Sequence, residues 1–260
     1  MKTDPSKHGR GRAFLLSKLL AAALAVGLGV IAPGAWADSI RLNVSLDYGD
    51  ADGPLVIQGA STSFGFGALI PQLVYTTERF GAFGVGYGYG YGPNQTATLG
   101  PVSGTGDLES DVLQFTYSNQ FALTDSLSLM LLYENRQYEV KGTLDGSFGS
   151  QQAPIAVKSN IDFEEAGVRL AYTWAENLRL FAGVSSLDWR VDSNAFAAVG
   201  DSVTAEVDAV GGDTAVQYSV GADTVVWERP LRLELRAADL EADRTVSKVE
   251  LRLTTTLLSF

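Results

Sequence analysis

The chain of 260 residues carries 19 Lys and Arg against 30 Asp and Glu, and it contains no cysteine and one histidine, His8. This acidic balance excludes a typical nucleic-acid-binding protein, because phosphates would repel it, and the lack of cysteine excludes disulfides and a cysteine-linked lipid anchor. No imidazole is available beyond the N-terminal segment, so we expect no His-based hydrolytic site and no enzyme.

Residues 1–37 are expected to be a cleaved signal peptide. Five bases precede an apolar run at 19–31, and Ala35 and Ala37 fit the small-residue pattern read by signal peptidase. The run is shorter than the roughly 20 apolar residues of a membrane-spanning helix. The mature domain is expected to be residues 38–260, with 14 Lys and Arg against 29 Asp and Glu and a formal net charge of −15.

Apolar and polar residues alternate with a period of two in ten segments of the mature domain. Because successive side chains of a strand point to opposite faces, each segment predicts a strand with one apolar and one polar face. One segment changes parity between Val184 and Leu187, which predicts a bulge. In chain order the segments are 39–48, 64–70, 83–91, 113–123, 127–133, 166–174, 178–191, 216–226, 231–237 and 249–257.

Tight and long connections alternate between these segments. Tight turns are predicted at 76–79, 124–126, 175–177 and 227–230, and long loops rich in Gly, Asp and Ser at 49–61, 93–107, 143–158 and 192–213. Short periplasmic turns and longer external loops are typical of membrane barrels. We expect an all-β fold, a transmembrane antiparallel up-and-down β-barrel of ten strands, with 8 or 12 as alternatives. The alternating stretch 202–210 either extends the eighth strand or forms an extra hairpin.

A soluble β-sandwich or lipocalin-like barrel would also alternate, with its apolar face inward. Charges in the middle of the polar faces favour a membrane barrel with a charged lumen, and aromatic residues near the strand ends fit a membrane interface. The apolar faces are therefore expected to meet lipid. The inward charges predict a lumen charge lattice made of Arg41, Glu134, Arg136, Arg169, Glu234, Arg236, Glu250 and Arg252.

The last hairpin has a register that its charges predict. If the hairpin centres on Asp243, Arg236 faces Glu250 and Glu234 faces Arg252. Opposite charges on facing positions stabilise a sheet by about 0.2–1 kcal/mol for each pair.

Residues 251–260 resemble the C-terminal strand of bacterial outer-membrane β-barrels. In that superfamily a terminal aromatic residue closes an alternating strand and is read by the barrel-assembly machinery. The resemblance implies that Phe260 is an assembly signal. It also implies a location in the cell outer membrane, in contact with outer-membrane lipid and lipopolysaccharide. Leu258 and Phe260 differ in parity from Leu251 and Leu253, so either the parity shifts at 254–256 or Phe260 lies at the interface.

Four glycines alternate with tyrosines in the third segment and predict a lumen glycine wall of Gly84, Gly86, Gly88 and Gly90. Such a wall either lines a groove or pore, or relieves crowding from long Arg and Glu side chains opposite. The strict spacing of two fits no phosphate-binding loop.

The acidic residues do not predict catalysis or metal binding. Asp162 and Glu164 would share one strand face and Glu165 the other, and we interpret this cluster as a solvated strand end. The acidic outer loops contain no spacing typical of a calcium loop, so they are interpreted as a solvated surface. No catalytic, cofactor or metal site is expected.

Two functions remain open for such a barrel. A small passive channel or transporter of small solutes is the first hypothesis, since the lumen is charged and has a glycine wall. The alternative is a non-conducting structural or surface-binding outer-membrane protein with acidic extracellular loops, because side chains usually fill a small barrel.

Overall fold

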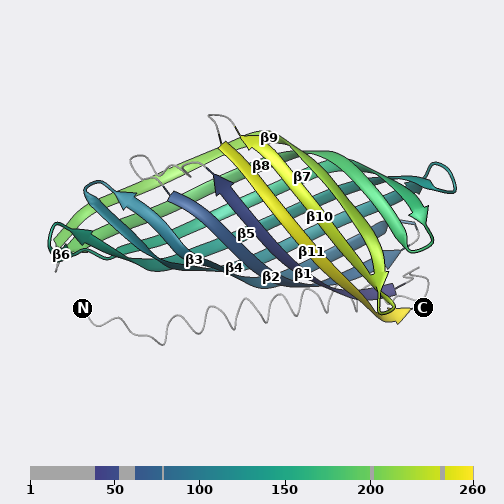
Figure 1. The fold of residues 1–260 in the computed structure, drawn as a ribbon, viewed down its shortest axis with the longest axis horizontal. Helices are drawn as coiled ribbons and strands as arrows, with labels where there is room; N and C mark the ends of the chain where they lie inside the picture. Colours follow the sequence, from purple (N-terminus) through teal and green to yellow (C-terminus); the bar gives the residue numbers. More distant parts are fainter. Residues whose placement is uncertain (1–38, 53–61, 78, 200–201, 241–243, 260) are drawn as a thin grey trace.

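The computed structural model describes residues 39–52, 62–77, 79–199, 202–240 and 244–259, so the expected signal peptide and Phe260 lie outside the described residues. The described residues form one antiparallel sheet that is rolled into a long tube with steeply tilted strands (Figure 1). Its strands are β1 (Ser39–Asp52), β2 (Thr62–Thr77), β3 (Gly81–Leu99), β4 (Val102–Ala122), β5 (Leu127–Phe148), β6 (Gln151–Gln152), β7 (Ile155–Ala175), β8 (Leu178–Val199), β9 (Ser202–Val226), β10 (Arg229–Leu240) and β11 (Arg244–Ser259).

Ten of the described strands close into a ring. Strands that follow one another in the chain pair in antiparallel fashion, and β1 pairs with β11 to complete the circle. The remaining segment, β6, is two residues long and pairs with the end of β5. The expected ten-stranded up-and-down barrel is confirmed. Closure pairs the backbone groups that lipid could not satisfy.

Three of the predicted long loops are instead strands. Residues 93–107 belong to β3 and β4 around a turn at 100–101. Residues 143–148, 151–152 and 155–158 belong to β5, β6 and β7, and 192–199 and 202–213 to β8 and β9. The stretch 202–210 therefore extends β9 and forms no extra hairpin. Asp107, Asp145 and Asp192 lie outside and alternate with inward apolar side chains, whereas Gly104 and Ser193 are themselves buried inside. Pairing in the sheet overrides the weak strand propensity of these residues. In the first predicted loop, 53–61 lie outside the described residues.

Along the strands the apolar residues move from the outer to the inner face, although successive side chains continue to alternate between outside and inside. Near the tight turns, β7 exposes Val168 and Leu170 on the outside and buries Arg169 inside. At its other end, Lys158 is outside and Ile155 is fully buried inside. The tight-turn part is thus built like a membrane barrel, and the far part like a soluble one. We call the far part, residues 93–111, 137–164, 188–199 and 202–213, the projection.

This inversion explains why the predicted bulge is wrong. Between Val184 and Leu187, β8 keeps an unbroken register with both β7 and β9. Leu187 and Trp189 point inward like Ser185 before them. The apolar residues change from even to odd positions because the strand leaves the lipid belt and its apolar face becomes the inner one.

Strand β2 also differs from expectation, because Ala68 and Ile70 face the lumen, whereas Leu69 and Leu73 are exposed outside. Inside the barrel, Ile70 packs with Ala68 and Val112. Ala68 and Ile70 therefore fill the interior and do not face lipid.

The register of the last hairpin is displaced by two residues from the prediction. Glu234 lies opposite Glu250, and Arg236 lies opposite Lys248. Like charges face each other across this pair of strands. They are tolerated because oppositely charged side chains from other strands of the barrel pair with them. At the end of β11, the register against β1 shifts between Ile40, which pairs with Leu258, and Arg41, which pairs with Thr256. The extra residue is Leu257, directly after 254–256. This shift accounts for the difference in parity between Leu258 and Leu253.

The interior of the projection is a hydrophobic core. Its buried side chains come from five strands, β3, β4, β5, β7 and β8, together with Ala153, and those of Ala205 and Val207 on β9 pack against them. The core residues are Ala97, Leu99, Val102, Leu108, Val140, Leu144, Ala153, Ile155, Val157, Ile161, Trp189, Val191, Ala195 and Ala197. No water-filled path is expected through a core packed in this way.

Candidate functional site

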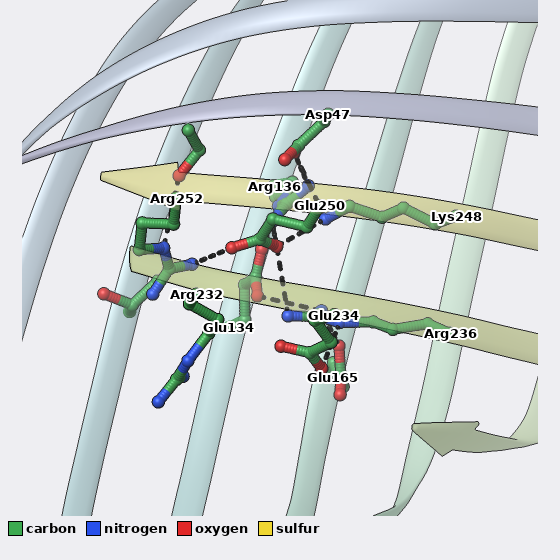
Figure 2. A network of polar contacts seen from close by, with 12 residues as sticks. Asp47, Glu134, Arg136, Glu165, Arg232, Glu234, Arg236, Lys248, Glu250 and Arg252 are labelled. Atoms are coloured by element: carbon green, nitrogen blue, oxygen red, sulfur yellow. Dashed lines mark hydrogen bonds and ion pairs between the residues drawn. The ribbon is translucent and has the colours of Figure 1, made fainter. Parts of the chain in front are cut away.

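A network of buried ion pairs crosses the lumen below the projection. Arg236, on β10, contacts carboxylates from three other strands, β5, β7 and β11 (Figure 2). Its Nη1 lies 2.6 Å from Oε2 of Glu165 and 3.1 Å from Oε2 of Glu134, and its Nη2 lies 3.2 Å from Oε2 of Glu250. The alternation of each strand turns these side chains inward, and closure of the ring brings them together.

Arg136, on β5, is the second centre of this network. It pairs with Asp47 of β1 and Glu134 of its own strand, and its Nη2 lies 3.2 Å from Oε2 of Glu250. Lys248 contacts the same oxygen of Glu250 at 3.1 Å and Oδ2 of Asp47 at 3.2 Å. Glu250 thereby receives several cations at once, which offsets the cost of burying its charge.

Of the eight predicted lattice residues, all except Arg41 belong to this network. Arg169 pairs with Glu234, and Arg252 pairs with Glu250. Arg41 lies nearer the tight turns, where its Nε donates a hydrogen bond to Oγ of Ser39 at 3.0 Å.

The sequence prediction missed three members of the network, Asp47, Glu165 and Lys248. Glu165 was grouped with Asp162 and Glu164, yet it is buried while those two are exposed outside. Alternation already separates Glu165 from them. Its role could have been inferred from its position four residues before inward Arg169.

The glycine wall lies on the inner face, but neighbouring side chains cover much of it. A Cβ on Gly84 would lie 2.4 Å from Oγ1 of Thr116, and one on Gly86 would lie 3.0 Å from Cγ2 of Ile70. On Gly88 it would lie 2.3 Å from the carbonyl oxygen of Leu69. These glycines allow the neighbouring strands and their side chains to approach closely. Gly90 is buried as well.

A cavity of about 500 Å³ lies at the tight-turn end of the lumen. Thr77, Gly81 and Pro230 line it and mark its position, because each is close to a turn. Its charged lining residues are Arg41, Glu134, Arg169, Arg179, Asp223, Arg232, Arg236 and Arg252.

Asp223 holds two of these arginines at once. Nε and Nη2 of Arg232 donate to its two carboxylate oxygens at 2.7 and 3.0 Å, and Nε of Arg179 lies 3.3 Å from Oδ2. The ring of Phe181 packs beneath the guanidinium of Arg232, whose carbon lies 5.0 Å from the ring centre. This packing orients the guanidinium and leaves part of it open to the cavity.

Tyrosine–carboxylate contacts mark the level at which the outer surface becomes polar. The hydroxyls of Tyr91 and Tyr133 donate to Asp107 and Glu164, respectively, on neighbouring strands. The hydrogen bond from Tyr91, with a second from the backbone N–H of Asn94, lowers the pKa of Asp107 from its ordinary value. The positions fit an aromatic girdle that meets water on its outer side.

Two further observations concern the described residues only. They contain no group of three or more His, Cys, Asp and Glu side chains arranged to hold a metal ion. Across the same ranges, no helix is long and apolar enough to cross a bilayer.

A closed barrel with an apolar outer belt and a polar lumen is the form in which β-strands cross an outer membrane. The described residues accordingly form a β-barrel of the membrane-spanning kind. No known family model matches the chain, and no curated protein sequence does.

Solved structures of similar shape include three bacterial proteins. The outer membrane protease OmpT of Escherichia coli is 10% identical with a TM-score of 0.48, over 85% of this chain and 97% of that one. The translocator domain of autotransporter NalP from Neisseria meningitidis is 12% identical, with a TM-score of 0.42, over 95% and 97%. The attachment invasion locus protein Ail of Yersinia pestis is 6% identical, with a TM-score of 0.40, over 84% and 97%. These three proteins have different roles. Because the sequence identities and TM-scores are low, no role is assigned to this chain from them.

Proposed function

We propose that this protein is a non-conducting outer-membrane barrel that holds a rigid, acidic β-sheet projection beyond the membrane. The observation that carries the proposal is the hydrophobic core of the projection, in which Leu99, Leu144 and Ile155 are almost fully buried. Packed apolar side chains exclude water, so they would close the outer end of the lumen to ions.

Two features nearer the tight turns support the same conclusion. The ion network joins opposite walls, and Arg136 and Glu234 within it are at most a few per cent exposed. The glycine wall, which favoured a pore in the sequence, is occupied by Ile70, Gln72 and Thr116. The hypothesis of a passive channel would require both the network and the core to move aside.

The outer surface of the projection supports a structural or surface-binding role. Its outward positions alternate with the core and carry many carboxylates, such as Glu109, Glu139 and Asp192. This acidic exterior keeps a large sheet solvated and favours cationic partners over phosphate-rich surfaces. Catalysis is not part of the proposal, because the only histidine of the chain is His8.

Conductance in planar bilayers tests the proposal. The purified, folded barrel should give no current steps above those of the bare bilayer, while a general porin in the same set-up provides the positive control. Folding is verified by the faster migration of unheated protein on SDS gels. Reproducible steps that scale with the amount of folded protein would overturn the proposal and support the channel.

Cysteine labelling tests where the projection lies, because the chain has no cysteine of its own. Asn160→Cys, outside on the projection, should react with a membrane-impermeant maleimide on intact cells. Glu176→Cys, in a tight turn, should react only after the outer membrane is permeabilised. The reverse pattern would contradict the orientation that the proposal requires.

A further inference from the structure

We propose that the arginine-lined cavity at the tight-turn end is a binding site for a small multivalent oxyanion, a phosphate-bearing or polycarboxylate group. The inference concerns the opposite end of the barrel from the projection and does not depend on whether the lumen conducts. It rests on the charge of the cavity, its unused donors, its size and its access.

The cavity concentrates positive charge in an acidic protein. Six arginines line it, together with the two carboxylates Glu134 and Asp223. Arg169, Arg236 and Arg252 are paired with glutamates of the ion network. The excess positive charge therefore comes from Arg41, Arg179 and Arg232, against the single carboxylate of Asp223. A recess that gathers one sign of charge between walls of low dielectric constant focuses the field and attracts counter-ions. Guanidinium groups also match the oxygen geometry of phosphate and carboxylate, so arginine is suited to both.

The arginines offer more donors than the cavity can satisfy. Arg179 and Arg232 share one carboxylate, that of Asp223. Arg41 forms no ion pair with another residue of the described ranges. Nε of Arg169 is buried and has no hydrogen-bond partner in the described part of the chain. An anion with several oxygens would accept from these groups together.

Size and access also fit a small solute. About 500 Å³ lies within the range of roughly 300–1,000 Å³ that is usual for small-molecule pockets. Polar side chains such as Thr116, Ser118 and Asn119 add hydroxyl and amide groups to the lining. Members of the ion network form one side of the cavity and the hydrophobic core lies beyond them, so the ligand would enter from the tight-turn end.

Calorimetry on the folded barrel in phosphatidylcholine nanodiscs tests this site, with inorganic pyrophosphate as probe and chloride at equal ionic strength as control. Wild type should bind about one equivalent saturably. The double variant Arg41→Gln/Arg179→Gln should bind at least ~10-fold more weakly, since it loses two charge-assisted contacts. Arg190→Gln is the matched control, because this arginine lies outside on the projection with its side chain 74% exposed, and it should bind like wild type.

A gain-of-affinity variant guards against a misfolded protein. Asp223→Asn removes the carboxylate that competes for Arg179 and Arg232, so pyrophosphate should bind several-fold more tightly. Equal weakening by Arg190→Gln would overturn the proposal. Absence of saturable pyrophosphate binding in wild type would overturn it as well, if no lipid headgroup is found to occupy the site.

The source of the anion is then distinguished with nanodiscs that contain phosphatidylglycerol. If a lipid headgroup occupies the cavity, native mass spectrometry should show the anionic lipid retained by wild type and lost by Arg41→Gln/Arg179→Gln. If the ligand is a free solute, pyrophosphate should bind equally well in both kinds of disc. If wild type neither retains the anionic lipid nor binds pyrophosphate, the cavity is not an oxyanion site.

Discussion

Arg236 and Glu165 form an ion pair inside the barrel, with Nη1 and Oε2 2.6 Å apart, although 71 positions separate them in the chain. Their strands, β10 and β7, are not neighbours, because β9 and β8 lie between them in the ring. The contact therefore spans the lumen and does not run along the sheet. It ties separate walls together at the level where the polar interior meets the apolar core.

Removing the charge of Arg236 should strongly destabilise the barrel. In Arg236→Met, Glu134, Glu165 and Glu250 would lose a shared cation while staying buried. Loss of one partner from a buried ion pair costs about 3–5 kcal/mol of unfolding free energy. Urea unfolding in lipid vesicles, followed by tryptophan fluorescence, measures it. Arg190→Met, at an exposed arginine, should change stability by less than ~0.5 kcal/mol, and an equal effect at both sites would refute the role assigned to the network.

The polarity inversion predicts unequal effects of arginine on one face of β7. Leu170→Arg places a charge in the lipid belt and should cost about 2–4 kcal/mol. Asn160→Arg lies on the same face in the projection, beside Glu139 and Asp192 on the neighbouring strands, and should be tolerated. Folding yields and unfolding free energies in vesicles compare the two. If both variants were equally damaging, the belt would extend along the whole strand, contrary to the structure.

The glycine wall predicts a steric effect at Gly88. A Cβ there would lie 2.3 Å from the carbonyl oxygen of Leu69 and 2.8 Å from Cα of Ile70. Because backbone atoms must move, Gly88→Ala should destabilise the barrel by about 1–3 kcal/mol. Gly67→Ala on the adjacent strand is the control, since its Cβ would have no atom closer than 3.8 Å. Thermal unfolding that shows no difference between these variants would mean that Gly88 has more room than the structure gives it.

Tryptophan quenching can separate the projection from the lipid belt. Trp174→Phe/Trp227→Phe leaves Trp189 in the mature domain, 5% exposed within the core of the projection. Its emission should be blue-shifted and resistant to both acrylamide and brominated lipids. The variant Trp189→Phe/Trp227→Phe keeps Trp174, which is 69% exposed near the tight turns and should be quenched by brominated lipids. Strong quenching of Trp189 by brominated lipids would contradict an apolar interior outside the membrane.

Much of the barrel could be predicted because alternation is a local property. Ten segments of period two correctly indicated ten strands, and the tight turns lie where they were expected. The inward direction of Arg236 follows from alternation, because Leu235 beside it is exposed outside. Arg136 has the parity opposite to that of Leu131 and Tyr133, which are exposed earlier on the same strand. Alternation does not indicate whether the apolar face contacts lipid or a protein core, because both remove apolar surface from water.

That ambiguity explains the errors. Parity changed at Val184 because the surroundings of the strand changed, and the sequence presents the same pattern for a bulge. The long loops were misread for a related reason, since their aspartates, such as Asp107, Asp145 and Asp192, cover the outer face of a soluble sheet. The hairpin register was wrong because the partners of Glu234 and Glu250 include Arg169 and Arg136 from other walls of the lumen.

The sequence by itself determined the strand number, the up-and-down order and the inward charges, since all of these depend on neighbours within one strand or turn. Only the tertiary structure decided the level at which polarity inverts, the closure of the lumen and the gathering of arginines around one cavity. Those features depend on closing the ring, which brings residues as distant as Asp47, Arg136 and Glu250 into contact. No local pattern encodes a distance across the lumen, so the candidate site emerges with the closed barrel.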